Sequence, residues 1–143
     1  MRELVGTYIN GRGIASGQNI PSPWKGTLEL QQEAIKEIDH PDAIAVLKIL
    51  ETCFCGTINI QFTQIEARPD WLYLLPNVTW FKEIAPENLH FHPITMIAND
   101  ISYKAFWYMG ARNLHGNMTA EILAPWIDGL VVDVSQIKIQ LED

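Results

Sequence analysis

The amino-acid sequence predicts an α+β fold, with an antiparallel or mixed sheet and an N-terminal helix pair packed on one face. Apolar residues recur at helical spacing over residues 27–55, whereas the rest of the chain reads mostly as strands with short helical inserts. Strands and helices do not alternate regularly along the chain, which argues against a doubly wound parallel sheet. The length of 143 residues is common for one domain, so we expect residues 1–143 to form a single globular domain.

The first part of the chain predicts a strand, a long loop and a helix. Residues 4–9 are apolar and partly β-branched, as strands are. Residues 10–26 contain four glycines and two prolines, and loops of this length are often functional or mobile. A helix follows over residues 27–38, with Thr27 at its start. Its expected buried face consists of residues four apart: Leu30, Ala34 and Ile38.

A second helix has clearer ends. Pro41 suits the first helical position, and either Asp39 or His40 can cap it. Gly56 stands where a helix would take a left-handed stop. The apolar residues between these ends recur at helical spacing, and they are Ala43, Val46, Leu47, Leu50, Cys53 and Phe54.

Most of the remaining chain has the pattern of strands. Apolar and polar residues alternate over 58–63 and over 136–141, which predicts strands with one buried face. Residues 71–75 form a shorter candidate strand. Residues 94–98 and 101–109 predict a hairpin across Asn99 and Asp100, because both residue types tolerate the positive φ of a two-residue turn.

Two short helical inserts are also expected. Residues 78–84 lie between Pro76 and Pro86 and predict one or two helical turns. Residues 119–123 predict the start of a short helix, which Pro125 should end or kink.

Charge and hydropathy exclude several classes of partner. The net charge is −7, from 17 acidic and 10 basic residues, and no two basic residues are adjacent. A nucleic-acid binder needs a basic stripe, so no nucleic acid is expected, and anionic membrane surfaces are disfavoured for the same reason. We expect no transmembrane helix, since no apolar run of about 18 residues occurs. Without the apolar core of a signal peptide at the N-terminus, a cytoplasmic location is expected.

No catalytic or cofactor-binding signature is present. Gly11 to Gly17 is glycine-rich, but a phosphate-binding loop needs a helix directly after it and a terminal Gly-Lys-Ser/Thr, which this segment lacks. His115 lies in a polar loop after a strand, where catalytic residues are often found, and it is the best single catalytic candidate. The sequence therefore predicts no cofactor and favours a binding protein over an enzyme.

His90 and His92 are the residues with metal-ligand spacing. On an extended strand both rings point to one face. A structural zinc site takes four ligands, however, and the helix pattern places Cys53 on a buried face and Cys55 at the helix end, where they cannot face one another. We therefore expect no bound metal, with His90 and His92 as the only candidates.

The charged surface motivates the first functional hypothesis. Three glutamates recur at intervals of four on the first predicted helix, and two aspartates extend the acidic patch: Glu29, Glu33, Glu37, Asp39 and Asp42. Such a face can steer a basic protein partner. The hypothesis is a small acidic protein-binding module, of the inhibitor or immunity type, that neutralises a basic protein. The alternative for this patch is a solvated helix face.

The second hypothesis is a small enzyme or a small-ligand-binding protein. Its pocket would be lined by aromatic residues and would use His90, His92 or His115 as the polar group. The aromatic candidates are Trp71, Trp80, Tyr103, Trp107 and Tyr108. An apolar pocket with converging histidine and carboxylate groups would favour this hypothesis. A flat acidic face would favour the first hypothesis.

Overall fold

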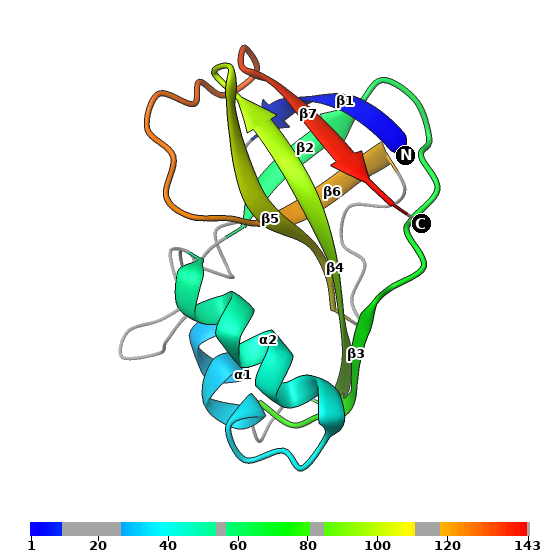
Figure 1. Ribbon diagram of the computed structural model, residues 1–143, viewed down its shortest axis with the longest axis vertical. Helices are drawn as coiled ribbons and strands as arrows, with labels where there is room; N and C mark the ends of the chain where they lie inside the picture. The colour runs from blue at the N-terminus through cyan, green and yellow to red at the C-terminus, as the bar shows by residue number, and fades with distance from the viewer. Residues whose placement is uncertain (10–26, 54–56, 81–84, 111–117, 143) are drawn as a thin grey trace.

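The computed structural model describes residues 1–9, 27–53, 57–80, 85–110 and 118–142 (Figure 1). These residues form two helices and seven strands, and every strand pairing is antiparallel. The elements in chain order are β1 (Arg2–Ile9), α1 (Thr27–Ile35), α2 (Pro41–Thr52), β2 (Ile58–Phe62), β3 (Tyr73–Val78), β4 (Glu87–Ala98), β5 (Ile101–Met109), β6 (Thr119–Leu123) and β7 (Gln136–Leu141).

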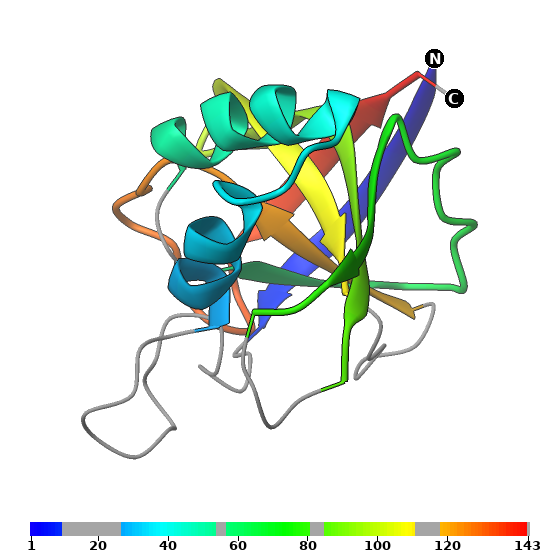
Figure 2. The same cartoon turned by 90° about the horizontal axis from the view of Figure 1, so that it is seen from below.

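The sheet closes on itself. Its strand order is β3-β4-β5-β6-β2-β1-β7, and β4 also pairs with β7. Six strands therefore form a ring, from β4 through β5, β6, β2, β1 and β7 back to β4, while β3 lies outside the ring. Figure 2 shows these strands arranged around a common centre, with both helices on the outside. Strand β4 makes this closure possible, because one half of it pairs with β7 and the other half with β3.

The main hydrophobic core lies inside the ring. Alternate residues of each strand point inward, as the two-residue period of a strand requires. Trp107 is at its centre, with the rings of Phe62 and Trp71 at 5.9 Å and 6.2 Å. The largest aliphatic contributions come from Leu4, Ile60, Ile94, Met96, Ile122, Ile137, Ile139 and Leu141.

The predicted α+β class, with a helix pair packed on one face of a sheet, is wrong. The fold is mainly β: a large antiparallel sheet of seven strands with two short helices, and 17% of it is helical. The physical reason is the closure between β4 and β7, which buries the apolar faces of the strands against one another. The two helices contribute only to a second, smaller cluster at one end, with members such as Ile35, Val46 and Phe91.

The helix boundaries were predicted in part. Helix α2 begins at Pro41 as expected, and His40 is its cap, because the His40 ring accepts a hydrogen bond of 3.0 Å from the Asp42 amide. Helix α1 begins at Thr27 but ends at Ile35 instead of Ile38. Among the α1 side chains that the structure describes, Gln31 and Ile35 are buried and Ala34 is partly buried. Ile38, beyond the helix, is also partly buried, and the side chain of Leu30 lies outside what the structure describes. The predicted stop at Gly56 lies outside the described residues.

The strand predictions were right where the local pattern was clear. The hairpin turn is confirmed, with Asn99 and Asp100 at φ of 50° and 62° between the paired residues Ala98 and Ile101. The helix predicted at residues 119–123 is wrong, because this segment is β6, held between β2 and β5. Of the helical turns predicted at 78–84, Val78 instead ends β3, and residues 81–84 lie outside the described residues.

Among the described residues, strand β3 pairs with another strand on one side only, and its outer edge is unsuited to further pairing. Pro76 has no N–H to donate, and Asn77 takes a φ of 54° at an irregularity in the register. The Leu74 amide donates to the Asp42 carboxylate at 3.2 Å, so α2 supplies the partner that a neighbouring strand would supply. Among the described residues, no helix is long and apolar enough to cross a membrane.

Candidate functional site

Strand β4 leaves β7 at Pro93. The ladder between these strands pairs Thr95 with Gln140, and the next step of the same register places Pro93 opposite Glu142. Proline has no N–H, so β4 has no donor to offer β7 at this position. On the N-terminal side of Pro93, from Phe91 back to Glu87, β4 pairs with β3 instead. The sequence thus directs the strand to change partners here.

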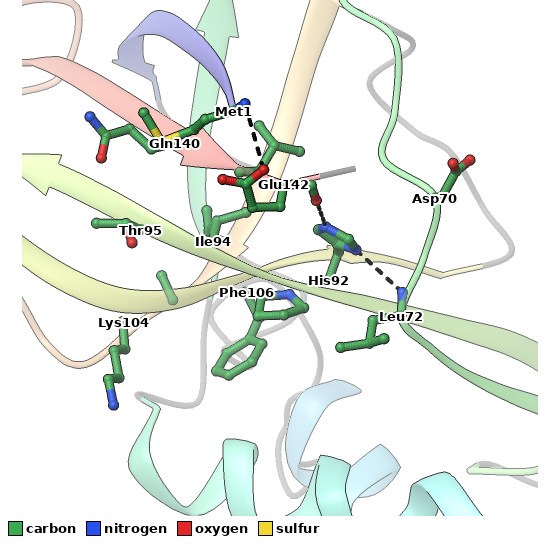
Figure 3. A pocket seen from close by; sticks show the side chains of 13 residues that line it. Met1, Asp70, Leu72, His92, Ile94, Thr95, Lys104, Phe106, Gln140 and Glu142 are labelled. Atoms are coloured by element: carbon green, nitrogen blue, oxygen red, sulfur yellow. Dashed lines mark hydrogen bonds and ion pairs between the residues drawn. The ribbon is translucent and has the colours of Figure 1, made fainter.

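His92 joins the three segments that meet at this point. Its Nε2 lies 2.7 Å from the Glu142 carbonyl oxygen, and its Nδ1 lies 3.3 Å from the Leu72 amide nitrogen (Figure 3). Because the Leu72 amide can only donate, Nδ1 accepts, and Nε2 carries the proton that it donates to the carbonyl. His92 is 7% exposed. The Nε2 donor therefore takes the place of the backbone donor that Pro93 lacks, and Nδ1 adds a second link, to the segment before β3.

A groove of about 610 Å³ lies beside this junction. Its lining comes from β4, β5, the end of β7 and the segment before β3 (Figure 3). Phe106 is paired directly with Pro93 across the β4–β5 ladder. Leu72, in the segment before β3, points toward Phe106. Leu72 is 56% exposed, which is high for a leucine at the wall of a groove. The lining is mainly apolar.

The groove also has polar side chains in its lining, among them Asp70, Thr95, Lys104 and Glu142. Lys104 is paired with Thr95, one ladder step from the Phe106 and Pro93 pair. Within the described part of the chain, the side chains of Lys104, Thr95 and Asp70 have no hydrogen bond or ion pair. The Glu142 carboxylate lies 3.5 Å from the Met1 ammonium, and both groups are well exposed. Lys104 is therefore the lining side chain that offers an unpaired positive charge.

The two histidines with metal-ligand spacing have different roles. His90 and His92 are on the same face of β4, as the strand period predicts. Both nitrogens of His92 are used by Leu72 and Glu142, however. The His90 ring makes a tilted contact with the Trp71 ring, and its Nδ1 lies 3.3 Å from the Met109 carbonyl oxygen. The described residues contain no group of three or more His, Cys, Asp or Glu side chains that could hold a metal. Cys55 is not among the described residues.

The acidic residues do not form one helical stripe. Glu33 is on α1, whereas Glu37 and Asp39 follow its end, and all three are exposed. Asp42 is partly buried and accepts the hydrogen bond from Leu74, so it has a structural role. Glu29 lies on α1, and its side chain is outside what the structure describes. The catalytic candidate His115 also lies outside the described residues.

The aromatic residues proposed for one pocket belong to two different cores. Trp107, Trp71 and Tyr103 pack in the ring of strands. Tyr108 and Trp80 belong to the cluster near the helices. They therefore do not line a common cavity, and the aromatic side chain of the groove is Phe106.

A buried polar row across β5, β6 and β2 was missed from the sequence. Glu121 is paired with Tyr108 on one side and with Asn59 on the other. Burial raises the pKa of the Tyr108 phenol, which donates to Gln31 of α1 at 2.9 Å, and burial also raises the pKa of the Glu121 carboxyl. The Asn59 Oδ1 is buried without a hydrogen-bond partner. These residues are far apart in sequence, so only the strand register reveals the row.

Comparison with known protein families and with curated proteins found no match to this chain.

Proposed function

We propose that the protein binds a small, mainly apolar ligand in the groove beside the β4–β7 junction. The observation that carries this proposal is a groove of about 610 Å³ lined mainly by apolar side chains. Ligand sites in proteins commonly have volumes of about 300–1,000 Å³ and combine an apolar lining with a few polar groups. The groove has both properties.

The construction of the groove supports a site that exists before the ligand arrives. Pro93 ends the pairing with β7, and His92 holds Leu72 and Glu142 at fixed positions on either side. These are backbone contacts made by a buried ring. A wall fixed in this way does not have to be ordered on binding, which lowers the entropic cost of association. The exposed Leu72 side chain then gains apolar contact when a ligand enters.

The test uses a neutral apolar dye, N-phenylnaphthylamine, whose fluorescence rises in apolar surroundings. The dye should bind the wild-type protein, and Thr95→Trp should abolish the signal because the indole fills the groove beside Phe106. Thr79→Trp is the matched control, since Thr79 is exposed and does not line the groove. The proposal is wrong if the dye does not bind, or if both variants bind it as the wild type does.

A second proposal is that the acidic surface docks a basic protein, as an inhibitor or immunity-type protein would. It is supported by the exposed side chains of Glu33, Glu37 and Asp39, which gather near the end of α1 and the start of α2. The net charge of −7 favours such a partner over long range.

An oligolysine peptide tests the acidic surface. Its amide shifts should centre on residues 33–39 and should weaken as salt is raised through about 0.15 M, where the screening length is near 8 Å. The triple variant Glu33→Gln, Glu37→Gln, Asp39→Asn should remove them, while Glu51→Gln on α2 should not. Shifts spread evenly over the surface would contradict a defined docking site.

A further inference from the structure

The groove has an apolar strip with a cation at one end, and this arrangement defines the class of ligand. The inference rests on the proposed ligand-binding function. Three apolar side chains lie along its floor and wall: Phe106, Pro93 and Leu72. In Figure 3, Leu72 and Phe106 point toward one another below β4, and Lys104 lies on the far side of Phe106. A ligand that follows this strip therefore has an apolar body and meets a cation at one end.

The Lys104 end carries two hydrogen-bond donors. Thr95 and Lys104 are directly paired across the β4–β5 ladder, so their side chains project from the same face about 5 Å apart at Cβ. The side chains of both residues are unpaired within the described part of the chain. An ammonium and a hydroxyl on adjacent strands can each donate to one oxygen of a carboxylate. The next pair on the same face, Pro93 with Phe106, lies two residues or about 7 Å further along the strands, where an alkyl or aryl chain would begin.

The opposite end of the groove disfavours a second negative charge. Asp70 lies there, exposed and without an ion pair to any described residue, whereas the nearby Glu142 carboxylate is paired with the Met1 ammonium. A dicarboxylate would place its second charge near the unpaired Asp70 carboxylate. The net charge of −7 repels anions in general, but at about 0.15 M salt this repulsion is screened beyond about 8 Å. The short-range attraction between a ligand carboxylate and Lys104 therefore outweighs it.

We propose that the groove binds a monocarboxylate with an apolar chain, whose carboxylate lies on Lys104 and Thr95 and whose chain covers Phe106, Pro93 and Leu72. Octanol, octylammonium and suberate share the chain length of octanoate and differ only in the end groups. Octanoate should bind about five- to tenfold more tightly than octanol, since a charge-assisted hydrogen bond at a partly exposed site contributes modestly. Octylammonium and suberate should bind more weakly than octanoate.

The variants separate the head group from the apolar strip. Lys104→Gln should reduce the affinity for octanoate to that for octanol and leave octanol binding unchanged. Thr95→Val, which keeps the shape of the side chain, should reduce octanoate affinity about two- to threefold through the loss of one neutral donor. Lys48→Gln is the control, because Lys48 is an exposed lysine of α2 that does not line the groove. Titration calorimetry gives each affinity.

Each outcome has a distinct meaning. If octanol binds as tightly as octanoate in the wild type, the ligand-binding function stands and the carboxylate assignment fails. If octylammonium binds best, the charged end lies at Asp70 and the assignment is reversed. If none of these molecules binds, and the neutral dye does not bind either, both the assignment and the proposed function are wrong.

Discussion

Replacing His92 with alanine should destabilise the protein strongly, because the buried ring joins two backbone segments. The substitution removes the hydrogen bonds to the Leu72 amide and to the Glu142 carbonyl, at 3.3 Å and 2.7 Å. Each bond contributes about 0.5–1.5 kcal/mol net, and a buried group left without a partner costs about 1–3 kcal/mol. Because water in the adjacent groove can reach part of the exposed backbone, we expect a total loss of about 2–4 kcal/mol.

The assay is urea unfolding followed by tryptophan fluorescence, with amide hydrogen exchange as a local readout. For a chain of this length, the loss corresponds to a melting temperature lower by roughly 8–16 °C. The Leu72 amide should exchange faster in His92→Ala. His92→Gln should be intermediate, since its amide can still donate to the Glu142 carbonyl from near the position of Nε2.

His90→Ala is the matched control for this experiment. His90 lies on the same face of β4, but it makes one longer polar contact, at 3.3 Å to the Met109 carbonyl, and a tilted ring contact with Trp71. Its removal should cost about 1 kcal/mol. The reasoning is refuted if His92→Ala stays within about 0.5 kcal/mol of the wild type, or if His90→Ala is the more destabilised of the two.

Three further predictions concern the buried polar row and the hairpin. Burial raises the pKa of Glu121 in the folded protein above its value in the unfolded chain. Its contribution to stability is therefore present at low pH and is lost as the pH rises through the pKa of the folded state. The stability of the wild type relative to Glu121→Gln should increase as the pH is lowered from 7 to 4. Tyr108→Phe should cost about 1–2 kcal/mol by leaving Gln31 without its donor, and should lose less stability between pH 9 and pH 11 than the wild type, because burial raises the pKa of the phenol. Asp100→Gly should raise the unfolding free energy by about 0.5–1 kcal/mol, since glycine adopts the observed φ of 62° without strain, and an unchanged urea midpoint would contradict this.

Local patterns were enough to predict several elements of the fold. The alternation in β2 and β7, the proline start of α2 and the Asn99-Asp100 turn all depend on neighbouring residues. Their physical causes are the two-residue period of a strand and the φ preferences of a few residue types. Such causes act within a few residues and can be found in a sequence.

The closure of the sheet could not be predicted in the same way. It depends on the pairing of Thr95 with Gln140, which are distant in sequence and have no local signal for one another. Two errors follow from the same limitation. The segment Thr119–Leu123 contains good helix formers, but its pairing with β2 and β5 overrides that preference. The first half of β4 was not predicted, and Pro93, which lies inside this strand, marks the point where the strand changes partners.

The candidate site shows the same division. The spacing of His90 and His92 drew attention to the correct strand, but it suggested a metal site. The role of His92 is determined by Leu72 and Glu142, which no motif connects to it. Thr95 and Lys104 are paired by the hairpin that the sequence predicted across Asn99 and Asp100, but no motif marks either residue as a binding group.

The most direct test of the ligand-binding account is a map of amide chemical shifts during titration of the wild-type protein with octanoate. The account predicts saturable shifts that centre on residues at the groove, in particular Leu72, Thr95, Lys104 and Phe106, with little change on α1 or α2. Saturable shifts that instead centre on the helices, or on the hairpin turn at Asn99 and Asp100, would contradict it, because they would place the binding site away from the β4–β7 junction.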